Sequence, residues 1–228
     1  MFFDYYYLVL VMPAILFALW AQAQVSGTFA KFSKVRTMRG LTGAQAAEAV
    51  LRAGGVYDVR IERISGNLTD HFDPRAKVIR LSDSVYDSPS VAAVGVAAHE
   101  AGHAVQHAQD YFPIKVRSAI IPVTQIGSSL ALPLIIIGLL LSSLNLVYLG
   151  IAFFGLSTVF QAVTLPVEFD ASRRAIATLG EEGLLAREEL PGAKKTLRAA
   201  ALTYVAALAV SLAQLLRLLL VFGGRRDD

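Results

Sequence analysis

The chain has 228 residues, of which 55% are hydrophobic and only 17% are charged, and this composition is too apolar for an ordinary soluble domain. The formal charge of +3 is small, and basic residues flank apolar blocks, which is typical of membrane topology and argues against nucleic acid as a partner. The absence of Cys excludes disulfide scaffolds, zinc ribbons, thiolate iron-sulfur clusters and cysteine nucleophiles. Any metal ion must therefore be bound by His and carboxylate groups.

The first predicted element is a membrane span over residues 5–25, with Trp20 as an interfacial anchor. A cleaved signal peptide is the alternative, because Ala21-Gln22-Ala23 looks like a cleavage site. However, the leading end carries Asp4 and no basic residue, whereas a signal peptide has a basic n-region. The sequence favours a retained anchor.

The next segment, residues 26–117, is predicted to be a small folded unit. Thr42 is a suitable N-cap for a helix that ends at Gly54. Alternating apolar residues over 59–64 and the apolar run 77–81 predict two short strands, separated by a polar turn region. The second strand is a candidate edge for pairing with an extended peptide.

A helix over about residues 89–109 completes this segment. Ser88 is its predicted N-cap, with Pro89 at the first helical position, and Ser90 is the alternative cap. This helix carries the motif His99-Glu100-Ala101-Gly102-His103.

Residues 118–167 contain no charged residue and no His. A single helix of this length would measure about 75 Å, against about 30 Å for the hydrocarbon core of a membrane. The polar stretch Ser142-Ser143-Leu144-Asn145 divides the block into two predicted spans, 119–141 and 146–165. The sequence therefore predicts a transmembrane hairpin.

A second polar segment, residues 166–198, precedes a fourth apolar block over residues 199–222. This block contains Arg217, which must snorkel, pair, or face the protein interior. Basic residues gather in the two polar segments, so both are predicted to be cytoplasmic, and the turn at Ser143 is predicted to be external.

The spacing of the motif residues predicts a metal site. Residues four apart lie on one face of a helix, so His99 and His103 can bind the same ion. Glu100 lies about 100° around the helix and can act on a metal-activated water. This pattern is typical of catalytic zinc sites, in which three protein ligands leave one coordination position open for water. The zinc ion therefore needs a third protein ligand.

The third ligand must come from another part of the chain. His107 continues the helical row, but three ligands spread over about 12 Å cannot converge on one ion. Glu168 fits better, because it follows the third span at a helix start, and two spans return the chain to the side of His103. Asp170 is the alternative ligand.

Three features together carry a family resemblance: HEAGHAVQHA at residues 99–108, LPVEFDASRRA at residues 165–175, and four apolar segments. With these features the chain resembles, over nearly its whole length, the YugP-like neutral zinc metallopeptidases of bacterial membranes. The resemblance implies a gluzincin-type endopeptidase of the bacterial cell membrane, related in layout to the HtpX proteases, with Glu168 as third ligand. These relatives usually carry an acidic residue four positions after that Glu, where this chain has Ser172. The sequence leaves open whether Ser172, with a weaker hydrogen bond, or Asp170 takes the place of this partner of a zinc-binding His.

The predicted fold is a mainly α integral membrane domain over residues 1–228, with about four transmembrane helices and a small α+β, zincin-like cytoplasmic part. The predicted function is hydrolysis of membrane or membrane-proximal proteins with one catalytic Zn²⁺, and with Glu100 as general base. No nucleotide is expected, because no GxxxxGK[ST] motif occurs. A non-catalytic scaffold with a structural metal site is the alternative. The candidates for stabilising the oxyanion are His71, His107, Tyr111, Arg173 and Arg174.

Overall fold

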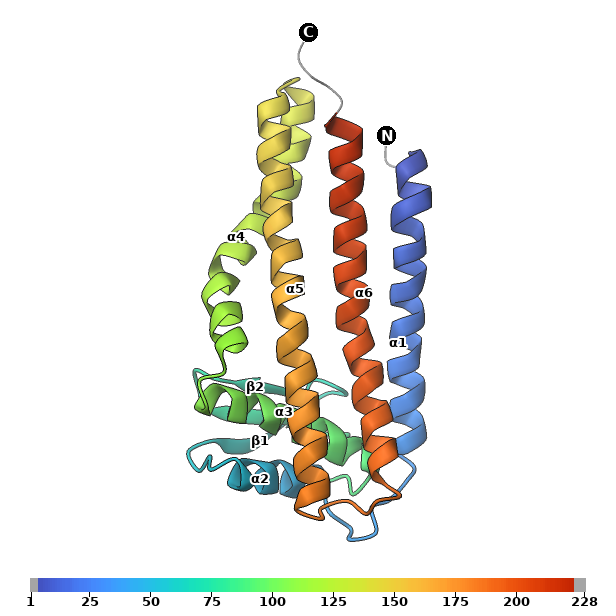
Figure 1. Cartoon of the computed structure of the whole chain (residues 1–228), viewed down its shortest axis with the longest axis vertical. Helices are drawn as coiled ribbons and strands as arrows, with labels where there is room; N and C mark the ends of the chain where they lie inside the picture. The colour runs from blue at the N-terminus through green and yellow to red at the C-terminus, as the bar shows by residue number, and fades with distance from the viewer. Residues whose placement is uncertain (1–3, 224–228) are drawn as a thin grey trace. The chain divides into compact units, whose positions relative to one another are not determined.

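The structure is a computed structural model, and it describes residues 4–223. It is mainly helical, with one small sheet, as the sequence predicts (Figure 1). Within the described residues, four helical segments are long and apolar enough to cross a membrane: Tyr7–Phe32, Phe112–Leu140, Leu144–Glu181 and Leu190–Phe222. The first contains a short π-helical stretch, η1 (Tyr7–Val11), followed by α1 (Met12–Phe32). The others are α4 (Phe112–Leu140), α5 (Leu144–Glu181) and α6 (Leu190–Phe222).

The chain forms two compact units, and the first comprises the described parts of Met1–Ala21, Val116–Leu165 and Thr203–Asp228. Here α4 and α5 form the predicted hairpin, because α4 ends at Leu140 and α5 begins at Leu144. Ser142 turns the chain with a left-handed φ of 52°. Gly150 allows the close approach of the two helices, since a Cβ at this position would lie 2.7 Å from the Ala131 carbonyl oxygen.

Arg217 forms an ion pair, which is one of the three alternatives that its position predicts. Its guanidinium donates to the carboxylate of Asp4, with Nη2 2.6 Å and Nε 3.0 Å from Oδ2. The guanidinium also lies over the Tyr7 ring, 5.3 Å from its centre. The start of the first candidate span and the C-terminal half of α6 therefore lie together.

The second unit comprises Gln22–Lys115 and Pro166–Leu202. It contains a three-stranded sheet with strands β1 (Arg60–Ile64), β2 (His71–Asp73) and β3 (Val78–Ser82). β3 is central, parallel to β1 and antiparallel to β2. The prediction of an available edge at 77–81 is therefore wrong, because β3 has a neighbour on both sides. β2 was not predicted, because it has only three residues and Asp73-Pro74 at its end indicates a turn.

This unit also contains two capped helices. α2 (Gly43–Ala53) begins with a capping box, in which Thr42 and Gln45 each bond the backbone N–H of the other. α3 (Val91–Ala108) begins after Ser90, whose hydroxyl accepts from the Ala93 N–H at 3.2 Å. The alternative cap is therefore the one used, and Ser88 is not the N-cap.

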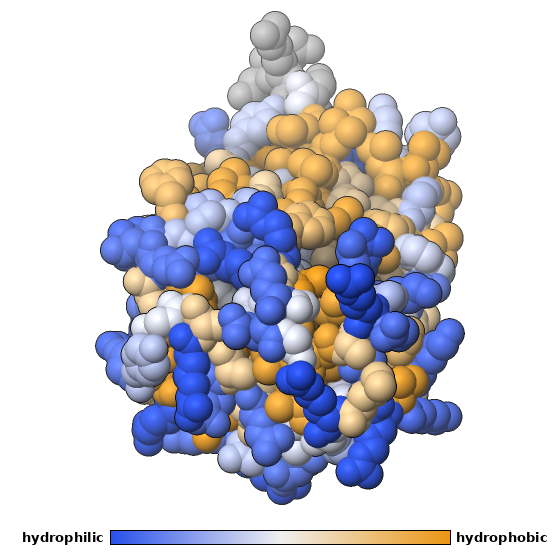
Figure 2. Space-filling model, turned by 60° about the horizontal axis from the view of Figure 1, so that its bottom comes forward, coloured by the Kyte–Doolittle hydropathy of each residue, from blue (hydrophilic) through white to orange (hydrophobic). Residues whose placement is uncertain are grey.

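The core of the second unit is built around the small side chains of α3. Six alanines of this helix are essentially inaccessible to solvent: Ala92, Ala93, Ala97, Ala98, Ala101 and Ala104. Such small residues let neighbouring helices approach closely, and α3 packs against α2, β2 and β3. Figure 2 shows hydrophilic side chains gathered over the lower part of the drawn face, with hydrophobic side chains among them and above them.

Candidate metal centre

The site is formed in the second unit by α3 and by the part of α5 that follows Leu165. α3 presents His99 and His103 on one face, one turn apart, and α5 presents Glu168 from the opposite side. The Nε2 atoms of the two His rings are 3.1 Å apart. Glu168 Oε2 lies 3.3 Å from His99 Nε2 and 3.4 Å from His103 Nε2. The structure thus brings together the three residues that the sequence predicts as ligands.

The three atoms have the spacing that a zinc ion requires. Ligand atoms about 2.1 Å from zinc in a tetrahedron are about 3.4 Å from one another. The observed separations of 3.1, 3.3 and 3.4 Å are close to this value. Two imidazoles and one carboxylate also form a common donor set of catalytic zinc sites. The residues present therefore fit a zinc ion.

Burial makes a cation favourable at this position. The Glu168 side chain is 3% exposed, and a buried carboxylate requires compensating positive charge. Burial disfavours the charged form of His103, but its hydrogen bond with Glu168 and nearby negative charge outweigh this effect, so the pKa of His103 is raised. The site therefore attracts positive charge, which a bound divalent ion can supply.

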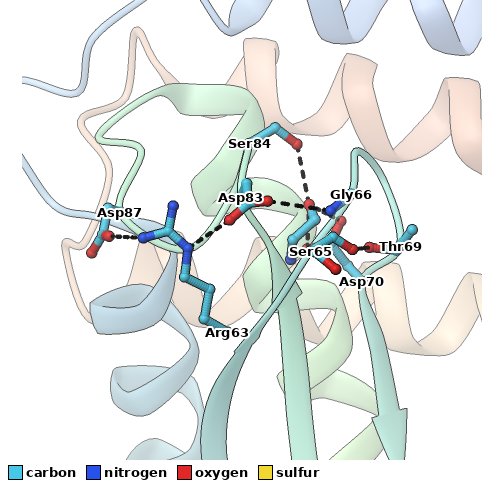
Figure 3. Close-up of polar contacts among 9 residues, drawn as sticks. Arg63, Ser65, Gly66, Thr69, Asp70, Asp83, Ser84 and Asp87 are labelled. Atoms are coloured by element: carbon cyan, nitrogen blue, oxygen red, sulfur yellow. Dashed lines mark hydrogen bonds and ion pairs between the residues drawn. The ribbon is translucent and has the colours of Figure 1, made fainter.

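Glu100 is half-buried on α3, next to His99. Its charge acts on Asp70, which lies between β1 and β2. Burial raises the pKa of the Asp70 carboxyl, and the charge of Glu100 adds to the effect, although hydrogen bonds from Ser82 oppose it. The loop carrying Asp70 is fixed near its start, where Asp83 accepts from the Gly66 N–H and from Arg63 (Figure 3). Asp70 was not identified from the sequence, because an isolated Asp in a loop carries no pattern.

Gly102, inside the motif, allows the close contact of α3 with α5. A Cβ at this position would lie 2.8 Å from the carbonyl oxygen of Ala171, which is a backbone atom and cannot rotate away. The same contact places Glu168, one turn before Ala171 on α5, opposite the two His rings.

Gly102→Ala is therefore expected to separate the two helices, to lower stability by about 1–3 kcal/mol and to weaken zinc binding. Gly95→Ala is the matched control, because its Cβ would meet Ala193 at an ordinary 3.4 Å and Ala is the better helix former. Thermal unfolding with and without zinc measures both effects. Equal behaviour of the two variants would contradict the role assigned to Gly102.

Ser172 contacts one of the candidate ligands, one helical turn after Glu168. Its hydroxyl lies 3.1 Å from His99 Nδ1. A hydroxyl carries no charge, whereas a carboxylate at position 172 would give a charge-assisted hydrogen bond.

Ser172→Ala is expected to weaken zinc affinity about tenfold, the low end of such effects, because His99 loses an orienting partner. Ser172→Asp is expected to equal or exceed the wild type. Zinc titration in detergent checks both, and unchanged affinity in Ser172→Ala would mean that this hydrogen bond does not orient His99.

Asp170, the alternative ligand, lies away from the three-residue cluster. Its carboxylate accepts from Arg174 Nε at 2.5 Å, from Arg173, and from Gln106 Nε2 at 2.9 Å. Gln106 in turn contacts His103, with 3.1 Å between Oε1 and Nδ1. Gln106 was not singled out from the sequence, although its position three residues after His103 places it on the same helix face.

The candidates for oxyanion stabilisation have other partners in the structure. His71 Nδ1 lies 2.9 Å from the Thr69 carbonyl oxygen, and His107 packs edge-on against Phe72. Tyr111 lies beneath the guanidinium of Arg174. The role of these residues stays a prediction.

Comparison with known proteins shows the family to which the chain belongs. Residues 7–223 match the model of a family described as "Putative neutral zinc metallopeptidase". The chain is 46% identical over 222 residues to a Bacillus subtilis (strain 168) protein named "Putative membrane protease YugP", covering 97% of this chain and 99% of that one. No solved structure matches the chain.

Proposed function

Because the chain belongs to this family of neutral zinc metallopeptidases, we propose that it is a membrane-embedded endopeptidase with one catalytic zinc ion. The observation that carries the proposal is the convergence of His99, His103 and Glu168 from two helices, at separations that suit a tetrahedral ion. Glu100 beside these ligands supports catalysis over a purely structural site, since a structural site has no use for a base at that position.

His99, His103 and Glu168 would hold the ion. Zinc in such a site supplies Lewis acidity, which polarises a carbonyl group and makes water nucleophilic at neutral pH. Glu100 takes a proton from the attacking water while the water oxygen forms a bond to the scissile carbonyl carbon. Glu100 then gives this proton to the amine nitrogen as the carbon–nitrogen bond breaks, so no covalent enzyme intermediate is needed.

The substrates we propose are membrane proteins or proteins near the membrane surface. Glu168 supports this choice, because the same helix, α5, contains the third apolar segment, which ends about one turn before it. We place the protein in the bacterial cell membrane with the site on the cytoplasmic side, since basic residues gather in both polar segments.

Reporter fusions test this orientation. A reporter after Arg39 or Leu190 is expected to read cytoplasmic, and a reporter at Ser143 is expected to read external, because basic loops stay in the cytoplasm. A cytoplasmic reading at Ser143 would contradict the proposed topology.

The activity itself is tested with purified protein in detergent and an unfolded substrate such as casein. Hydrolysis should stop when a chelator removes the metal and should return when zinc is added. Hydrolysis that survives complete metal removal would contradict the proposal, as would failure of the metal-loaded protein to cleave any of a panel of unfolded and membrane-proximal peptides.

A further inference from the structure

Gln106 lies between a candidate ligand and the helix that supplies the third one. Its side chain is fully buried. The amide nitrogen Nε2 donates to the Val167 carbonyl oxygen and to Asp170 Oδ2, both at 2.9 Å. The amide oxygen Oε1 faces His103 Nδ1 at 3.1 Å. All the hydrogen-bonding capacity of the amide nitrogen is therefore directed at α5.

The surroundings permit only one orientation of this amide. A backbone carbonyl such as that of Val167 can only accept a hydrogen bond, so it must face the NH₂ group. Asp170 is held by the guanidinium groups of Arg173 and Arg174, which favour its ionised, acceptor-only form. The NH₂ group thus has two fixed acceptors, and the oxygen of Gln106 must point to His103.

This orientation determines where the His103 ring carries its proton. An amide oxygen cannot donate, so His103 Nδ1 must be the donor in this contact. The other nitrogen, Nε2, then presents its lone pair toward His99 Nε2 and Glu168 Oε2, which lie 3.1 and 3.4 Å away. A neutral imidazole bound to a metal requires this arrangement, with the proton on the nitrogen that faces away from the ion.

We propose that Gln106 is a positioning residue that fixes the tautomer and orientation of His103 for metal binding, and that Asp170 acts on the site through Gln106. Ser172, the partner of His99, does not impose the same constraint, because a hydroxyl can either donate or accept. The proposal rests on the metal site of the proposed function and not on peptide hydrolysis.

Zinc affinity gives the first test. Gln106→Met keeps an unbranched side chain of similar size but removes both the acceptor and the NH₂ group. Zinc binding, measured by competition with a chelator, is expected to weaken about 10- to 100-fold. Gln24→Met is the control, because Gln24 is exposed on α1, away from the hydrogen bonds of Gln106, and should leave zinc affinity unchanged. Equal affinity of Gln106→Met and wild type would overturn the proposal.

A spectroscopic measurement on the wild type avoids any dependence on how the variant folds. The chain has only four His residues, so their ¹⁵N signals in labelled protein can be assigned by single substitutions. In protein loaded with ¹¹³Cd²⁺, coupling to the metal is expected at His103 Nε2, with a slowly exchanging proton on Nδ1. Coupling at Nδ1, or rapid exchange of its proton, would overturn the proposal. Neither test measures cleavage, so both test the proposal about Gln106 even if the protein has no protease activity.

Discussion

Replacing Glu100 with Gln is expected to reduce peptide hydrolysis by about 10²- to 10⁴-fold, the usual contribution of a general base. Zinc should remain bound, because the three candidate ligands are His99, His103 and Glu168, and the amide of Gln has nearly the volume of the carboxylate. The amide cannot take the proton of the attacking water. Hydrolysis of casein and zinc content, measured on the same preparation, give the result.

Glu48→Gln is the matched control, since Glu48 is exposed on α2 and pairs with Arg52. It should leave both hydrolysis and zinc content unchanged. If Glu100→Gln lost zinc as completely as His99→Ala, Glu100 would be a ligand or a structural residue and the assignment of the base would be wrong.

Replacing Glu168 with Gln is expected to weaken zinc affinity and hydrolysis together. Loss of a charged ligand should weaken zinc affinity more than loss of a residue that only hydrogen-bonds to a ligand, which typically weakens the affinity about 10- to 100-fold. The substitution keeps the volume of the side chain, so the contact of α5 with α3 should persist. Zinc titration in detergent, followed by hydrolysis at saturating zinc, separates weaker binding from slower chemistry.

Asp170→Asn is the control on the same helix. Its side-chain oxygen can still accept from Gln106, so zinc affinity should change much less than in Glu168→Gln. The reverse result, with zinc retained in Glu168→Gln and lost in Asp170→Asn, would mean that Asp170 is the ligand.

The sequence predicts those features that depend on short-range geometry. Four apolar segments of sufficient length predicted the four long helices, because membrane thickness sets the length of a span. The four-residue spacing of His99 and His103 placed both rings on one helix face, since this follows from the pitch of the helix alone. Thr42 was recognised as an N-cap from its own position before an alanine-rich stretch.

The features that were missed depend on residues far apart in the chain. Gln106 bonds to Val167 and Asp170, more than 60 positions later, and one sequence carries no signal for such a contact. β2 is held by its pairing with β3 rather than by its own three residues. The close packing at Gly102 depends on the backbone of Ala171 on another helix, which the residues around Gly102 do not reveal.

The zinc content of the purified protein tests the central claim most directly. Wild-type protein and His103→Ala are prepared in parallel in detergent, and metal is measured by atomic emission after removal of loosely bound ions. One zinc per chain in the wild type, and almost none in His103→Ala, is the expected result, since two remaining ligands hold zinc weakly. Wild-type protein without zinc after incubation with the ion, or equal zinc in both proteins, would contradict a metal centre at His99, His103 and Glu168.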